Sequence, residues 1–147
     1  MITVVARWED GYFGFLNGRV TEWCYWEQVF ISYGVDRVIF VPKLMDARKP
    51  EQYDTLDEAL ANVSEPKVFF ERAERARGIG REPIYLRDFQ HPEDVVYIFG
   101  STPTHNAKWV EEDDILVSIE IPSKGDMFAI TVAGIVLYDR EVKKNDC

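Results

Sequence analysis

The sequence has little cysteine and no long apolar run, and both absences exclude whole classes of protein. Its two cysteines, Cys24 and Cys147, fit neither a disulfide framework nor a set of zinc ligands, so both are predicted to be free thiols. No apolar run approaches the roughly 18 residues of a membrane-spanning helix. Arg7 and Glu9 also stand where a signal peptide would be apolar. We therefore expect a cytoplasmic protein with no membrane and no metal partner.

Positive charge is scarce as well. The chain has 17 Lys and Arg against 26 Asp and Glu, a net charge of -9, which argues against a protein that coats nucleic acid non-specifically. A local basic cluster could still bind RNA phosphates through bidentate hydrogen bonds. Alternatively, the glutamates that alternate with these arginines pair with them on a solvated helix face. The cluster consists of Arg72, Arg75, Arg77, Arg81 and Arg87.

Apolar and aromatic residues, in contrast, are plentiful. They make up 46% and 14% of the 147 residues, which is enough for a packed interior in a chain of single-domain size. We predict one domain over residues 1–147, with no internal repeat and no low-complexity segment.

Five apolar segments rich in β-branched and aromatic residues are predicted to be strands. They are Ile2–Arg7, Arg37–Val41, Val68–Phe70, Val95–Phe99 and Ile115–Ile121. Turn dipeptides at Asp10-Gly11 and Asn17-Gly18 bracket an apolar stretch that could form a small hairpin. Glu71–Arg81 is charged and ends in glycines, so we predict a mobile surface loop there.

Three segments are predicted to be helices. In Thr21–Tyr33, Trp23, Trp26 and Phe30 recur at helical spacing; such aromatics could stack on bases, but the spacing favours core or dimer interface. A second helix begins after Thr55, which forms a capping box with Glu58. The last covers about Met127–Arg140.

Strands that alternate with helices predict an α/β fold, a mostly parallel sheet with helices on both faces. In such sheets, ligands bind beyond the carboxyl ends of the strands. Polar turns fall at two of these ends, Gly100–Thr104 and Pro122–Asp126. Either they form a ligand pocket or they are ordinary surface turns.

Three segments of the last third carry a resemblance to a known family. Val95–Ser101, Asp113–Pro122 and Met127–Asp139 resemble, in order and spacing, the carboxyl half of the SpoU/TrmH branch of the SPOUT methyltransferases. Gly34–Ile39 and Phe69–Arg77 also resemble earlier segments of that family. The resemblance implies a SPOUT-type fold with a C-terminal trefoil knot, S-adenosyl-L-methionine as cofactor, a homodimer, and tRNA or rRNA as substrate.

By the same resemblance, the cofactor would lie against three backbone segments. Gly100 and Gly125 would let the backbone approach it closely, because glycine has no side chain to clash. The implied cofactor-binding residues are Phe70, Phe99, Gly100, Ser101, Thr102, Ile119, Ile121, Pro122, Gly125, Met127, Phe128 and Ile130.

The chain departs from the family at the reaction centre. Counted back from Gly34, the family's first-motif asparagine falls on Glu22 and its catalytic arginine on Gln28, so these two and the nearby Arg19 are the candidate catalytic residues. His105 could act as a base, although a lone histidine is more often structural, and His91 is predicted to lie in a loop.

Three hypotheses follow from these residues. The first is an RNA methyltransferase with a divergent catalytic centre, and the second is a non-catalytic SPOUT-fold binding protein that keeps the cofactor pocket or the dimer. The third is an α/β domain unrelated to methyl transfer.

Overall fold

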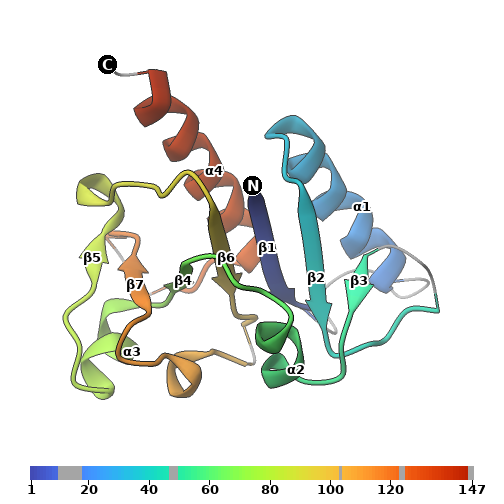
Figure 1. The fold of residues 1–147 in the computed structure, drawn as a ribbon, viewed down its shortest axis with the longest axis horizontal. Helices are drawn as coiled ribbons and strands as arrows, with labels where there is room; N and C mark the ends of the chain where they lie inside the picture. The colour runs from blue at the N-terminus through green and yellow to red at the C-terminus, as the bar shows by residue number, and fades with distance from the viewer. Residues whose placement is uncertain (10–17, 47–49, 103, 123–124, 146–147) are drawn as a thin grey trace.

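The computed structural model describes residues 1–9, 18–46, 50–102, 104–122 and 125–145. Seven strands form one sheet in the order β3-β2-β1-β6-β4-β7-β5, and every neighbouring pair is parallel (Figure 1). The predicted parallel sheet is therefore confirmed. The strands are β1 (Ile2–Arg7), β2 (Arg37–Val41), β3 (Glu51–Gln52), β4 (Lys67–Phe70), β5 (Ile84–Tyr85), β6 (Val95–Phe99) and β7 (Ile115–Ser118).

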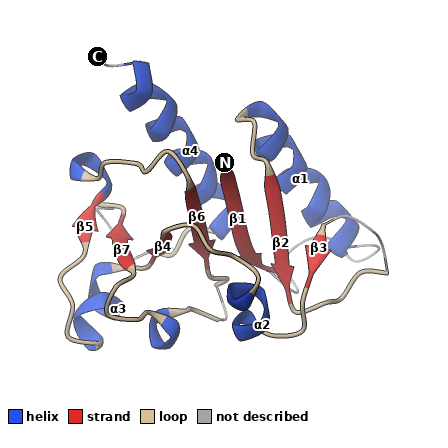
Figure 2. Cartoon of the chain, in the orientation of Figure 1, coloured by secondary structure: helices blue, strands red, loops and turns tan. Residues whose placement is uncertain are grey.

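Helices cover both faces of the sheet, as predicted (Figure 2). On one face lie α1 (Gly18–Ser32) and α4 (Ala129–Asn145), and on the other lie α2 (Leu56–Ala61) and α3 (Ala73–Gly78). Two short 3-10 helices, Leu86–Asp88 and Ala107–Trp109, lie in the connections. The start of α4 lies near the carboxyl ends of the strands, and the helix runs back toward their amino ends (Figure 1).

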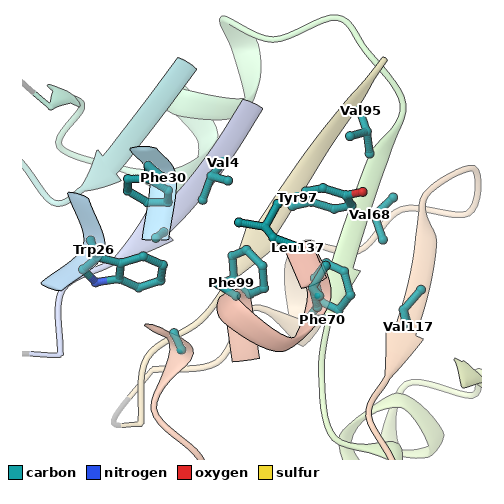
Figure 3. Close-up of a cluster of buried hydrophobic side chains, with 14 of the residues drawn as sticks. Val4, Trp26, Phe30, Val68, Phe70, Val95, Tyr97, Phe99, Val117 and Leu137 are labelled. Carbon is teal, nitrogen blue, oxygen red and sulfur yellow. The ribbon is translucent and has the colours of Figure 1, made fainter. Parts of the chain in front are cut away.

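Alternation along the strands divides the core in two. In β1, Val4 faces α1 and α4 while its neighbour Val5 faces the α2 side, as a side-chain period of two requires. Figure 3 shows the first cluster, in which Trp26 and Phe30 of α1 lie beside the strands. Both rings are almost fully buried, which confirms that these aromatics belong to the core.

Local signals explain where α2 begins and where α1 ends. The side chain of Thr55 accepts a hydrogen bond from the backbone N–H of Glu58 at 3.2 Å and so caps α2, as predicted. Beyond α1, Gly34 has a φ of 64°, a backbone conformation that glycine adopts without strain.

Several predicted boundaries are wrong. Residues 73–78 form α3 instead of a mobile loop, because Ala76 is fully buried against the second core cluster and this packing stabilises the helix. Strand β7 ends at Ser118 rather than Ile121, and α4 begins at Ala129 and continues to Asn145. Strands β3 and β5 were not predicted, since two residues are too few to show a pattern.

Two further predictions fall partly or wholly outside the described residues. The hairpin bracketed by Asp10-Gly11 and Asn17-Gly18 lies there, and so does Cys147. Cys24 is exposed and free, as predicted. None of the helices in the described ranges has the length and apolar character to cross a bilayer.

Candidate functional site

A hollow opens at the carboxyl edge of the sheet, where the parallel strands end. Its empty space, counting the open solvent at its mouth, is about 670 Å³. Its inner wall is apolar and includes Phe70, Phe99 and Val117 from the ends of β4, β6 and β7. The rings of Phe70 and Phe99 stack with centroids 4.9 Å apart, and Figure 3 shows them side by side.

The hollow brings together nine of the twelve residues that sequence analysis proposed for the cofactor. These are Phe70, Phe99, Gly100, Ser101, Thr102, Ile119, Ile121, Gly125 and Met127. Pro122, Phe128 and Ile130 do not line it, and Ile130 packs against the first core cluster. That these residues bind a cofactor stays a prediction.

Several charged and polar residues of the lining were not among those predicted from the sequence to bind the cofactor. Glu71, Arg72 and Arg75 follow β4, Ser118 ends β7, and Asp126 precedes α4. Arg72 and Arg75 were candidates for RNA contact rather than for this pocket, and Glu71 was not singled out, because residues 71–81 were predicted to form a mobile surface loop. Their position directly after a buried strand was the signal that could have found them.

The turn after β6 is folded tightly on itself. The N–H of Ser101 donates to the carbonyl of Thr104 at 2.8 Å, and the N–H of Thr104 donates back at 3.2 Å. A Cβ atom on Gly100 would lie 2.9 Å from the carbonyl oxygen of Thr104, closer than real Cβ contacts. Glycine is therefore required here by the turn itself.

A fully buried carboxylate, Glu9, lies behind this turn. It accepts the backbone N–H of Thr102 at 2.8 and 3.0 Å, and that of Ala129 at the start of α4 at 3.5 Å. The N–H of Glu9 itself donates to both carboxylate oxygens of Glu22 at 2.9 Å, and Trp26 Nε1 donates to Glu22 at 3.0 Å. Burial raises the pKa of Glu22. These bonds join the end of β1, the first helix and two segments of the hollow.

A second buried carboxylate, Glu71, holds the other end of the same turn. One of its oxygens accepts the N–H of Asn106 at 2.6 Å, and the other lies 4.0 Å from the guanidinium of Arg75. Arg7 Nε donates to the side-chain oxygen of Asn106 at 2.6 Å. Burial raises the pKa of Glu71, because removal from water disfavours the charged carboxylate. The backbone N–H of Asn106 and the guanidinium groups of Arg75 and Arg7 act in the opposite direction.

Charged side chains at the rim give the hollow a polar mouth. Arg72 and Asp126, both in the lining, form an ion pair at 3.0 Å. His105 also lines the hollow, and desolvation lowers its pKa, with further lowering from Arg75 and Lys108. This favours a neutral imidazole near pH 7, which can accept a proton.

The three candidate catalytic residues do not line the hollow. Glu22 is buried beneath Trp26, and Gln28 is exposed on α1. The guanidinium of Arg19 lies over the ring of Trp8, 6.0 Å from its centroid. Within one chain, the charged residues that line the hollow are instead Glu71, Arg72, Arg75 and Asp126.

The arginine cluster is largely engaged by acceptors of its own chain. Arg77 pairs with Glu82 at 2.9 Å, and Arg81 donates to the carbonyl of Asp114 at 2.8 Å. Arg87 lies 3.0 Å from Glu120, while Arg72 and Arg75 contact Asp126 and Glu71 as described above. This pairing favours the solvated-face alternative, and RNA contact by these arginines stays a prediction.

A different polar network lies toward the amino ends of the strands. His91 lies in a loop as predicted, but its side chain is only 5% exposed and lies 2.6 Å from Tyr97 Oη and 2.7 Å from Asp139. Arg140 donates to Tyr97 Oη at 2.9 Å and to the carbonyls of Pro92 and Glu93. Tyr97 is fully buried, so this network is internal rather than a second site.

No protein-family model matches the sequence, and no curated protein matches it either. Solved structures do match. An A. aeolicus TrmH/SpoU tRNA modifying enzyme superposes with a TM-score of 0.68 at 13% identity, over 99% of this chain and 76% of that one. The fold is that of the SpoU/TrmH methyltransferases. The SpoU methyltransferase AviRb from Streptomyces viridochromogenes, in complex with AdoMet, has a TM-score of 0.65 at 13% identity over 99% of this chain.

A third SpoU/TrmH-like structure, described as giving insights into 2-OH methylation of C/U34 on tRNA, has a TM-score of 0.66 at 12% identity. It is covered over 91% of its length, whereas this chain spans only 61% of AviRb. At such identities the comparisons show the fold alone. The described residues contain no cluster of three or more His, Cys, Asp or Glu that could hold a metal ion.

Proposed function

We propose that the hollow binds S-adenosylmethionine. The single observation that carries the proposal is a hollow lined by the segments after β6 and β7 and before α4, on a fold shared with an AdoMet-bound SpoU enzyme. One group of the lining suits a polar ligand: Thr102 lines the hollow, and its Oγ1 is buried with no hydrogen-bond partner in the part of the chain described. A hydroxyl in that state gains most from a polar ligand.

We further propose that the chain is an RNA methyltransferase with a divergent catalytic centre. The bound sulfonium would supply an already reactive methyl group, so the protein needs mainly to bind, orient and exclude water. His105, in the lining, could accept the proton of an attacking hydroxyl or amine. RNA, either tRNA or rRNA, is the substrate class supported by the fold.

Three structural features belong to the same proposal: a single domain over residues 1–147, a C-terminal trefoil knot and a homodimer. Support for the dimer comes from large apolar side chains that α1 and α4 leave exposed. They are Val20, Tyr25 and Ile31 on α1, and Ile135, Tyr138 and Val142 on α4. A solution mass near the 17.1 kDa of one chain, by light scattering at micromolar concentration, would contradict the dimer.

A non-catalytic binding protein is the second candidate. One observation favours it: Arg19, Glu22 and Gln28, which stand nearest to the family's reaction-centre positions, are absent from the lining. Such a protein would bind the cofactor without transferring the methyl group.

Two measurements test these proposals in turn. Calorimetry with S-adenosylhomocysteine should give a saturable heat, and no heat at millimolar ligand would contradict the proposed cofactor site. Incubation of RNA with methyl-labelled S-adenosylmethionine should then transfer label slowly, since loss of one stabilising contact typically costs about a hundredfold in rate. Fast ribose 2'-O-methylation would contradict the divergent centre, and binding without any transfer would support the second candidate. If Gln28→Arg increased transfer, that would support a centre lost by substitution.

A further inference from the structure

Two buried glutamates approach the turn after β6 from the two strands that flank β6. In the sheet, β1 and β4 are the neighbours of β6 on either side. Glu9 lies two residues beyond β1, and Glu71 directly follows β4. Both side chains therefore reach the carboxyl ends of the strands, one on each side of the turn to which residues 100–102 and 104–106 belong.

Each glutamate holds one end of this turn by a backbone amide. Glu9 accepts the N–H of Thr102 with both oxygens, at 2.8 and 3.0 Å, and Glu71 accepts the N–H of Asn106 at 2.6 Å. The partners are 93 and 35 residues apart in the chain, so neither bond belongs to a helix cap or a local turn. Glu9 also accepts the N–H of Ala129, which extends its reach to the start of α4.

The physical effect of this arrangement is to order a backbone that faces the hollow. Hydrogen bonds to an ionised acceptor are shorter and roughly twice as strong as neutral ones. Glu9 is 0% exposed and Glu71 8%, so water competes little for either acceptor. A turn held at both ends loses little further entropy when a ligand binds, which raises affinity without any new contact.

We propose that Glu9 and Glu71 are positioning residues that clamp the turn after β6, residues 100–102 and 104–106, and so set the affinity of the hollow for its ligand. The proposal rests on the function proposed above for the ligand's identity, but the clamp itself exists in the ligand-free protein. Neither glutamate needs to touch the ligand for this role, and Glu9 is not part of the lining.

The first test is amide hydrogen exchange followed by NMR in the ligand-free protein. Glu9→Gln keeps the shape of the side chain and one acceptor oxygen but removes the charge, so the Thr102 amide should exchange about fivefold faster. Glu71→Gln should do the same to the Asn106 amide. Rates for both amides that equal those of the wild type would overturn the clamp.

The second test is calorimetry with S-adenosylhomocysteine on the same proteins. Each Gln variant should raise the Kd about fivefold, and the double variant should raise it more than either single one. Glu51→Gln is the matched control. Glu51 lies on β3, the outermost strand on one side of the sheet, and pairs with Arg37 at 2.7 Å. This variant should lower stability and leave the Kd unchanged.

The outcomes separate the clamp from the proposed function. Faster exchange with an unchanged Kd would mean that the glutamates stabilise the fold but do not position the turn for a ligand, and the proposal would be wrong. Wild-type protein that gives no heat would contradict the proposed function, and the exchange rates would then decide alone whether the glutamates hold the turn. Glu9→Ala and Glu71→Ala, if folded, should raise the amide exchange rate and the Kd more than the Gln variants do, because each leaves an amide without its acceptor.

Discussion

The two ends of the parallel strands carry opposite kinds of charge, fully or largely buried carboxylates at one end and partly buried cations at the other. At the carboxyl edge, the carboxylates of Glu9 and Glu71 accept backbone N–H groups beside an open hollow. Toward the amino edge, Arg140 and Lys143 donate to backbone carbonyls around the buried ring of Tyr97. Both arrangements tie α4 to loops that are distant in sequence. Charged side chains hold backbone groups at both ends of the strands, and those at the carboxyl ends lie beside the hollow.

The largest effect is expected at the amino edge. Arg140→Ala removes donors to Tyr97 Oη at 2.9 Å, to the Pro92 carbonyl at 2.7 Å and to the Glu93 carbonyl at 2.9 Å. We expect a loss of about 2–3 kcal/mol in the free energy of unfolding, since hydrogen bonds to a charged group contribute about that much. Urea denaturation measures this, and the Kd for S-adenosylhomocysteine should stay within about twofold of wild type.

A matched control for this prediction is Arg87→Ala, whose side chain is mostly exposed beside Glu120. Exposed ion pairs contribute little, so its stability should change by less than about 1 kcal/mol. A large loss of ligand affinity in Arg140→Ala would break the separation between the two edges.

Gly100→Ala should act in the opposite way, on binding more than on folding. The added Cβ would meet the carbonyl oxygen of Thr104 at 2.9 Å, so the backbone of the turn that borders the hollow must shift. We expect about a tenfold rise in Kd, which corresponds to about 1.4 kcal/mol of binding free energy, measured by calorimetry.

The control is Gly134→Ala in α4, where no atom lies within 4 Å of the added Cβ. Alanine favours helix by up to about 1 kcal/mol over glycine, so stability should rise while the Kd stays constant. Equal binding by Gly100→Ala and wild type would show that the turn does not shape the site.

The amino-edge network should also make stability depend on pH. Burial is the largest cause that lowers the pKa of His91 from its ordinary value of 6.5, so the folded protein holds this imidazole neutral. The unfolded chain takes up the proton first as pH falls below about 6.5, and the contribution of His91 to stability is lost through the folded pKa. The slope from one such group is at most about 1.4 kcal/mol per pH unit.

His91→Gln should flatten the stability profile below about pH 6.5 relative to wild type, as urea denaturation at a series of pH values would measure. The raised pKa values of Glu22 and Glu71 act in the opposite direction, but both proteins share them, so the difference isolates His91. Parallel profiles for the two proteins would exclude His91 as the source.

The smallest effect is expected at the rim of the hollow. Asp126→Asn weakens the 3.0 Å pair with Arg72, and both side chains are partly exposed. Stability should fall by less than about 1 kcal/mol, and the Kd should change by about twofold, less so at high salt because exposed charges are screened. Calorimetry at two ionic strengths measures this, and a tenfold change would place this pair within the binding machinery.

Most of the frame could be predicted from the amino-acid sequence. The bounds of β1, β2 and β6 agree with the prediction, because an apolar strand of five or six residues ended by a turn residue is a local pattern. The cap at Thr55 is local in the same sense. The segments that line the hollow were predicted by position, since parallel strands bring their carboxyl ends to one edge.

Only the tertiary structure could reveal Glu9, Glu71 and His91 as buried groups. A glutamate or histidine beside a strand has the sequence pattern of a solvated residue, and its burial depends on donors and acceptors that fold next to it. Those partners are 93, 35 and 48 residues away for Thr102, Asn106 and Asp139. Helix α3 depends in the same way on the burial of Ala76. Local patterns therefore determine the longer strands and helices, while α3 and the charged groups beside the hollow are determined by contacts that exist only after the sheet has assembled.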